Sequence, residues 1–95
     1  MNQDEVIAIV HALARYLRSN PLACDSAAGI AQWWLPESEV SMEAVLHALE
    51  CLKEVGALEE TAGADGRVRY RRRGGNKALD AAVAALEGAP RQEKR

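Results

Sequence analysis

Hydrophobic residues recur at helical spacing in four stretches of the chain, and two shorter stretches alternate between apolar and polar positions. The first stretch has its apolar residues at Val6, Ile9, Val10, Leu13 and Leu17. This spacing predicts an amphipathic helix with one buried side. Asp4 is a suitable N-cap, and the helix is expected to end before Pro21, which disfavours helical geometry at Asn20.

A second helix is predicted to begin after Asp25 and Ser26, which are both good N-cap residues. Its apolar side consists of Ala27, Ile30, Ala31 and Trp34. Pro36 ends this helix, because a proline disfavours helical geometry at the residue before it. Residues 35–40 then form the connection to the third helix.

The third helix is predicted over residues 42–55, with Ser41 as its N-cap and Gly56 as a left-handed residue at its end. Its buried stripe consists of Val45, Ala48, Leu49 and Leu52. The same assignment turns outward Met42, Glu43, Leu46, His47, Glu50 and Glu54. The outward face therefore combines three carboxylates with two large apolar side chains, and Lys53 is the one lysine nearby.

Residues 58–61 and 67–71 are predicted to form a two-stranded wing, since residues 62–66 between them have the composition of a hairpin turn. In the second strand Val68 and Tyr70 alternate with arginines, which predicts one buried face and one basic face. Six cations are expected to form a basic patch here: Arg67, Arg69, Arg71, Arg72, Arg73 and Lys77.

A last helix is predicted over residues 76–87, with Asn76 as its cap and Leu79, Val83 and Leu86 on one side. Two interpretations of this apolar stripe stay open. It packs back onto the first helix, or it forms the interface of a homodimer, because the alanines around it allow a second copy to approach closely.

Composition fits one globular domain, predicted at residues 1–88, with residues 89–95 as a disordered tail. Of the 95 residues, 48% are hydrophobic and 27% charged, which is ordinary for a folded protein. No apolar run approaches the roughly 20 residues of a membrane span. The first residues are polar and acidic rather than signal-like, so a cytoplasmic location is expected. Cys24 and Cys51 are too few to indicate a disulfide framework.

Three helices followed by a hairpin, in this order and at these lengths, resemble the winged helix-turn-helix superfamily of the small, single-domain bacterial type. The resemblance covers residues 4–75 and is strongest over residues 41–70. It implies a mainly α fold with a small β-hairpin, made of a three-helix core, a two-stranded wing and a C-terminal helix. The connection at residues 35–40 is longer than the family's usual turn. Members of the superfamily bind DNA or proteins, so the resemblance leaves the partner open.

The distribution of charge along the chain distinguishes a protein partner from DNA. Residues 1–60 carry a net charge of −7 and residues 61–95 a net charge of +5. The acidic outward face of the third helix is unsuited to DNA, because phosphates repel carboxylates and base edges usually meet Arg, Lys, Asn or Gln. This face therefore favours a protein partner, with Met42, Glu43, Leu46, His47 and Glu50 as the predicted contacts. The alternative is a transcription regulator that contacts DNA through the basic wing.

The sequence offers few other candidates for a metal site, a catalytic site or an apolar anchor. His47 and Cys51 lie four residues apart on one helix and could hold a metal together. His11 and Cys24 are possible further ligands, but nothing in the spacing brings them close. No orienting group accompanies the pair either, so no metal, cofactor or catalytic site is predicted. Trp33 and Trp34 lie about 100° apart around a helix, so both cannot point to one core centre. Trp34 fits the buried position. Trp33 packs against an end helix, or it forms an apolar anchor together with Leu35.

Overall fold

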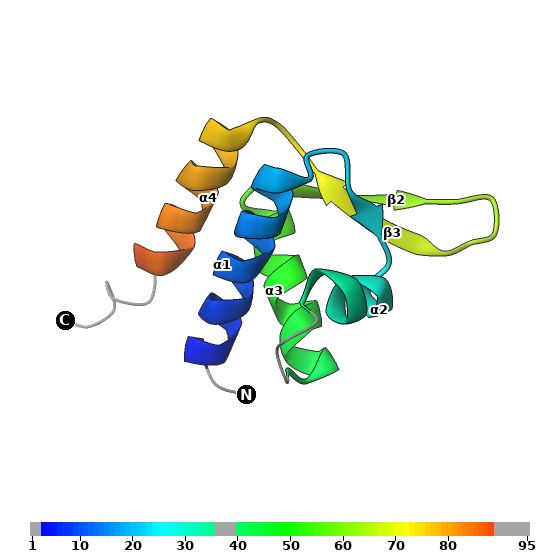
Figure 1. Cartoon of the computed structure of the whole chain (residues 1–95), viewed down its shortest axis with the longest axis horizontal. Coiled ribbons are helices and arrows are strands. Elements are labelled where there is room, and N and C mark those ends of the chain that lie inside the picture. The colour runs from blue at the N-terminus through cyan, green and yellow to red at the C-terminus, as the bar shows by residue number, and fades with distance from the viewer. Residues whose placement is uncertain (1–2, 36–39, 89–95) are drawn as a thin grey trace.

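A computed structural model describes residues 3–35 and 40–88 of the chain (Figure 1). The order of elements is α1 (Gln3–Ser19), β1 (Cys24–Asp25), α2 (Ala27–Gly29), a π-helical turn η1 (Ile30–Trp34), α3 (Met42–Glu54), β2 (Leu58–Ala62), β3 (Val68–Arg72) and α4 (Asn76–Gly88). The described part is mainly helical with a small antiparallel sheet. The tail predicted at residues 89–95 and most of the connection at 35–40 lie outside the described residues.

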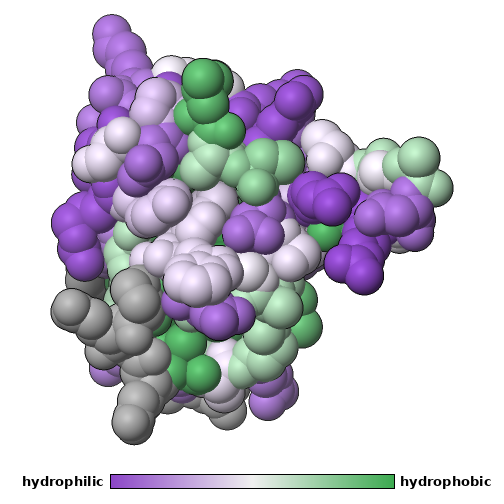
Figure 2. Space-filling model, turned by 45° about the vertical axis from the view of Figure 1, so that its right-hand side comes forward, coloured by the Kyte–Doolittle hydropathy of each residue, from purple (hydrophilic) through white to green (hydrophobic). Residues whose placement is uncertain are grey.

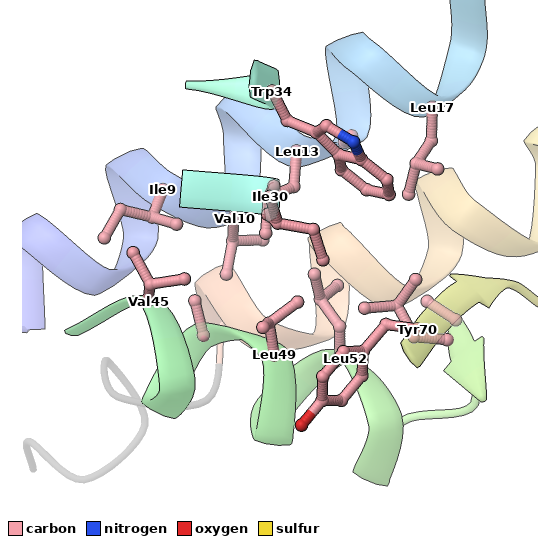
Figure 3. Close-up of a cluster of buried hydrophobic side chains, with 14 of the residues drawn as sticks. Ile9, Val10, Leu13, Leu17, Ile30, Trp34, Val45, Leu49, Leu52 and Tyr70 are labelled. Atoms are coloured by element: carbon pink, nitrogen blue, oxygen red, sulfur yellow. The ribbon is translucent and has the colours of Figure 1, made fainter. Parts of the chain in front are cut away.

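The core lies between α1, α3 and α4, with α2 and η1 closing one end and the sheet another (Figure 1). The predicted stripe of α1 is buried throughout, and so is the predicted stripe of α3. Figure 3 shows Val45 and Leu49 of α3 directed toward Val10 and Ile30, so the two longest stripes interlock.

α3 begins at Met42 as predicted and ends at Glu54, one residue earlier than predicted. The Ser41 hydroxyl accepts a hydrogen bond from the Ala44 amide at 3.0 Å, which satisfies one of the free amides of the first turn. At the other end Gly56 has a φ of 87°, a left-handed conformation that glycine adopts without steric cost. These two signals limit α3 to 13 residues.

The second helix begins as predicted but winds differently. Ser26 caps it by accepting from the Gly29 amide at 3.1 Å. After one α-helical turn the chain continues as the π-helical turn η1, which buries Ile30 and Trp34. The Trp34 ring stacks on Tyr16 of α1, with centroids 4.8 Å apart and planes 13° apart. This stack fixes the second helix against the first.

The sheet has three strands, whereas the sequence predicted two. β1 pairs with β3 in antiparallel register, with Cys24 opposite Arg71 and Asp25 opposite Tyr70. β2 pairs with the other side of β3, so the order is β1-β3-β2. β1 was not predicted, because a strand of two residues is too short to show an alternation of apolar and polar positions. Its hydrogen bonds also go to a strand far along the chain.

The predicted buried face of β3 is wrong at Val68. Tyr70 is buried, but Val68 is 43% exposed. The hairpin projects beyond the helices (Figure 1), so only the end of it near the body covers the core. The face of the hairpin that carries Tyr70 and Val68, called the inner face below, is therefore half core and half surface.

α4 packs along α1, as one of the two interpretations predicted. Leu79 and Val83 are buried and Leu86 packs partly against the core. An ion pair between Arg18 and Asp80 joins the end of α1 to α4. None of the described helices is both long enough and apolar enough to cross a membrane.

Substitution of leucine by alanine is expected to cost much more stability on the buried side of α3 than on its exposed side. Leu49→Ala removes a fully buried side chain and is expected to lower the free energy of unfolding by about 3 kcal/mol. Leu46 lies three residues before Leu49 and is exposed. Leu46→Ala is therefore expected to change the free energy of unfolding by less than about 0.5 kcal/mol. Urea denaturation of both variants measures this. Equal losses would mean that α3 is rotated from the position described.

Candidate functional site

The outward residues of α3 are exposed as predicted, and Met42, Glu43, Leu46, His47, Glu50 and Glu54 are called the α3 face below. Leu46 is 45% exposed and Met42 is 42% exposed. The rotation of α3 that buries Leu49 also places Leu46 in water. Two apolar side chains thus stand among carboxylates on one side of this helix.

A shallow depression lies on this face, lined by Leu46, His47, Glu50, Cys51 and Glu54. Leu46 and Cys51 contribute apolar surface, while Glu50 and Glu54 carry negative charge. Burial raises the pKa of the Cys51 thiol, and the charges of Glu54 and Glu50 raise it further. The thiol therefore stays protonated at neutral pH and behaves as a small apolar group.

Lys53 links the α3 face to the hairpin. Its ammonium group lies 3.1 Å from Glu50 and 2.9 Å from Glu60 of β2. The hydrogen bonds to Glu60 and Glu50 raise the pKa of Lys53, so the lysine stays charged. The one lysine near the α3 face is consequently engaged by two carboxylates of its own chain. Sequence reasoning missed the role of Glu60, which follows only from the packing of β2 beside α3.

The inner face of the hairpin also carries exposed residues, and β2 packs beside α3. Glu60 is paired with Tyr70 across the strands, and Ala62 with Val68. Because side chains alternate along a strand, all four lie on the inner face. Glu60, Ala62 and Val68 are exposed there. The inner face, like the α3 face, therefore carries exposed acidic and apolar residues.

The structure divides the six cations that were predicted to form one basic patch. Alternation places Arg69 and Arg71 on the outer face of the sheet, whereas Arg72 lies on the side of Tyr70. The Arg72 guanidinium donates to the Leu17 carbonyl at 3.4 Å and to the Asn76 side chain at 2.6 Å. Arg72 therefore joins α1, β3 and α4 and is only partly accessible.

Carboxylates accompany the remaining arginines of the hairpin. Arg71 forms an ion pair with Glu59 of the neighbouring strand. Arg67 and Arg69 each lie 3.8 Å from Asp65 in the turn. Figure 2 shows the projecting hairpin with strongly hydrophilic and apolar side chains intermixed. Arg73 and Lys77 are exposed, and neither forms an ion pair with another described residue.

A second depression lies at the outer face of the sheet. It is lined by Pro21, Leu22, Cys24, Glu59, Arg71, Arg72, Arg73 and Gly74. Leu22, in the loop after α1, is 94% exposed. This surface differs from the α3 face in charge, because its lining has three arginines and one carboxylate, that of Glu59.

The minor candidates have separate outcomes. Trp33 is 64% exposed, so it does not pack into the core, but Leu35 is buried and the suggested Trp33–Leu35 anchor is wrong. His47 and Cys51 do lie together in the α3 depression. In residues 3–35 and 40–88, no three side chains are placed to hold a metal ion.

Comparison of the chain with protein-family models, with curated protein sequences and with solved structures found no significant match. Function is therefore inferred from the exposed surfaces. The two that differ most in charge are the α3 face and the outer face of the sheet.

Cys51 reports on the α3 depression. Its raised pKa predicts that, with Cys24→Ser removing the exposed thiol, Cys51 reacts slowly with an aromatic disulfide at neutral pH and faster as the pH rises. Glu54→Gln in the same background is expected to lower the pKa of Cys51 and speed the reaction at neutral pH. Asp65→Asn, a change of the same charge in the hairpin turn, serves as the control. An equal acceleration by both substitutions would contradict the assigned cause.

Proposed function

We propose that this chain is a non-enzymatic winged-helix binding module, regulatory or adaptor in role, that docks a protein partner on the α3 face. The likeness to winged helices rests on three helices followed by a projecting hairpin. The location of the exposed apolar residues on the third of these helices supports the proposal. A fold of this kind leaves the choice of partner to the chemistry of the surface.

The observation that carries the proposal is the pairing of exposed Leu46 and Met42 with unneutralised carboxylates. Glu43 and Glu54 form no ion pair with a described residue, and Lys53 is already engaged. A phosphate backbone would be repelled from this face. A protein can cover Leu46 with an apolar side chain and meet the surrounding carboxylates with donors.

DNA binding through the hairpin is the second candidate. The exposed Arg67, Arg71, Arg73 and Lys77 favour it, since phosphate contacts need only accessible positive charge. The carboxylates of Glu59 and Asp65 compete with phosphates for these arginines. This competition ranks DNA below a protein partner.

Homodimerisation through α4 is a further candidate for the way the module assembles. Leu79 and Val83 are covered within the chain, so this dimer would use the small exposed residues Ala78, Ala81, Ala84 and Ala85. Sedimentation at high micromolar concentration in low salt is expected to detect it. A monomer under those conditions would exclude the α4 interface.

Substitutions on the two charged surfaces distinguish the partners. Leu46→Asp is expected to weaken the complex with a protein captured from the native extract by about 2 kcal/mol or more, about 30-fold in Kd. Glu43→Gln with Glu50→Gln is expected to slow association, since the carboxylates steer the partner. Surface plasmon resonance measures both effects.

The double variant Arg69→Ala with Arg71→Ala is the matched control and is expected to leave the protein complex unchanged. If DNA is the partner instead, this variant weakens binding to all sequences alike and lowers the salt dependence by about one phosphate contact per arginine. DNA binding that follows the arginines and ignores Leu46→Asp would reject the proposal.

A further inference from the structure

We infer that the partner segment is a basic amphipathic helix. It lies along the α3 face, with an arginine or lysine side chain in the α3 depression. This inference rests on the proposed function and specifies the chemistry of its partner. It draws on the charge of the α3 face and on the distribution of apolar and acidic groups within it.

Two features attach the hairpin to α3. Lys53 bridges Glu50 of α3 and Glu60 of β2. Tyr70 of β3 belongs, with Leu52 of α3, to the buried cluster drawn in Figure 3. The hairpin is therefore attached to α3 at its base, while its free end projects past the helix. A partner meets a preformed surface and loses little free energy in ordering it.

The charge of this surface selects a basic partner. Glu43, Glu50 and Glu54 are exposed on the α3 face, and Lys53, the one lysine of α3, is already bridged to Glu50 and Glu60. An apolar partner would cover the carboxylates of Glu50 and Glu54 without replacing their water, which is costly. A basic partner pairs with them.

The α3 depression matches the two parts of a long basic side chain. Leu46 and Cys51 supply apolar surface, and the raised pKa of Cys51 keeps its thiol uncharged. Glu50 and Glu54 stand at the rim. The aliphatic stem of an arginine or lysine lies on Leu46 and Cys51, and its charged head reaches Glu50 and Glu54.

The remaining exposed apolar residues indicate a helix. Met42 and Leu46 are both exposed and lie one turn apart on α3. The 13 residues of α3 offer a straight ridge about 20 Å long. A helix with apolar residues three or four positions apart packs along such a ridge while its basic residues face the carboxylates.

A second copy of this chain is a less suitable occupant. Arg73 and Lys77 form no ion pair with a described residue, but the hairpin arginines are accompanied by Glu59 and Asp65, and Arg72 is held by Asn76. The contacts of these arginines would have to break before they could reach another copy's carboxylates. A separate basic segment has no such cost.

Selection from a displayed library of 16-residue helical peptides tests the inference. Peptides are selected on the full chain and counter-selected on Leu46→Asp. The enriched peptides are expected to carry Arg or Lys beside apolar residues three or four positions away. Glu50→Gln with Glu54→Gln is expected to weaken their binding at least tenfold. Glu59→Gln with Asp65→Asn, which removes as much charge from the outer face and the turn, is expected to leave it unchanged.

The thiols provide a second readout on the same protein. Bound peptide is expected to protect Cys51 from alkylation and to leave the exposed Cys24 reactive. Enriched peptides that need Leu46 but lack basic residues would overturn the inference and leave the proposed function intact. Peptides indifferent to Leu46→Asp, or no enrichment, would overturn both. Self-association that Glu50→Gln with Glu54→Gln abolishes would assign the surface to a second copy and reject the basic helix.

Discussion

The contact between the buried stripe of α3 and the first helix determines the rest of this molecule. Val45, Leu49 and Leu52 are fully buried, and together they fix both the position of α3 and its rotation about its own axis. Rotation is the decisive quantity, because a turn of 100° separates neighbouring positions. Once Leu49 points inward, Glu50 and Leu46 are held in solvent. The exposed surface is thus a consequence of core packing and needs no separate stabilisation.

Local signals made most of the helical architecture predictable. Periodic apolar residues and the caps at Ser26, Ser41 and Gly56 act over a few positions, so the sequence alone places the helices. β1 depends on hydrogen bonds to Arg71 and Tyr70, more than forty residues away, and no local pattern encodes it. The π-helical turn is also beyond local prediction, because the stack of Trp34 on Tyr16 of another helix accompanies it.

The candidate site was predictable to the same extent and for the same reason. Exposure of Leu46 and Glu50 follows from the period of one helix. Three other features depend on tertiary placement: the bridge from Lys53 to Glu60, the inward role of Arg72, and the exposure of Val68. Alternation along β3 correctly separates its two faces, but it cannot say how far the strand extends beyond the core. The sequence therefore predicts that the inner face is buried, whereas part of it is exposed in the structure.

The two charged surfaces differ in how far the chain neutralises them. On the hairpin, Glu59 and Asp65 stand beside the arginines, which limits the attraction of this surface for another anion. On α3 the one lysine is shared between Glu50 and Glu60, and Glu43 and Glu54 have no partner among the described residues. Exposed charges without partners keep their full hydration and act at a distance within a Debye length, about 8 Å at physiological salt. The α3 face therefore keeps more of its charge unneutralised than the hairpin does, and the exposed Met42 and Leu46 lie among these carboxylates. In the proposed complex, the same helix would supply both the charge that steers the partner and the apolar residues that the partner covers.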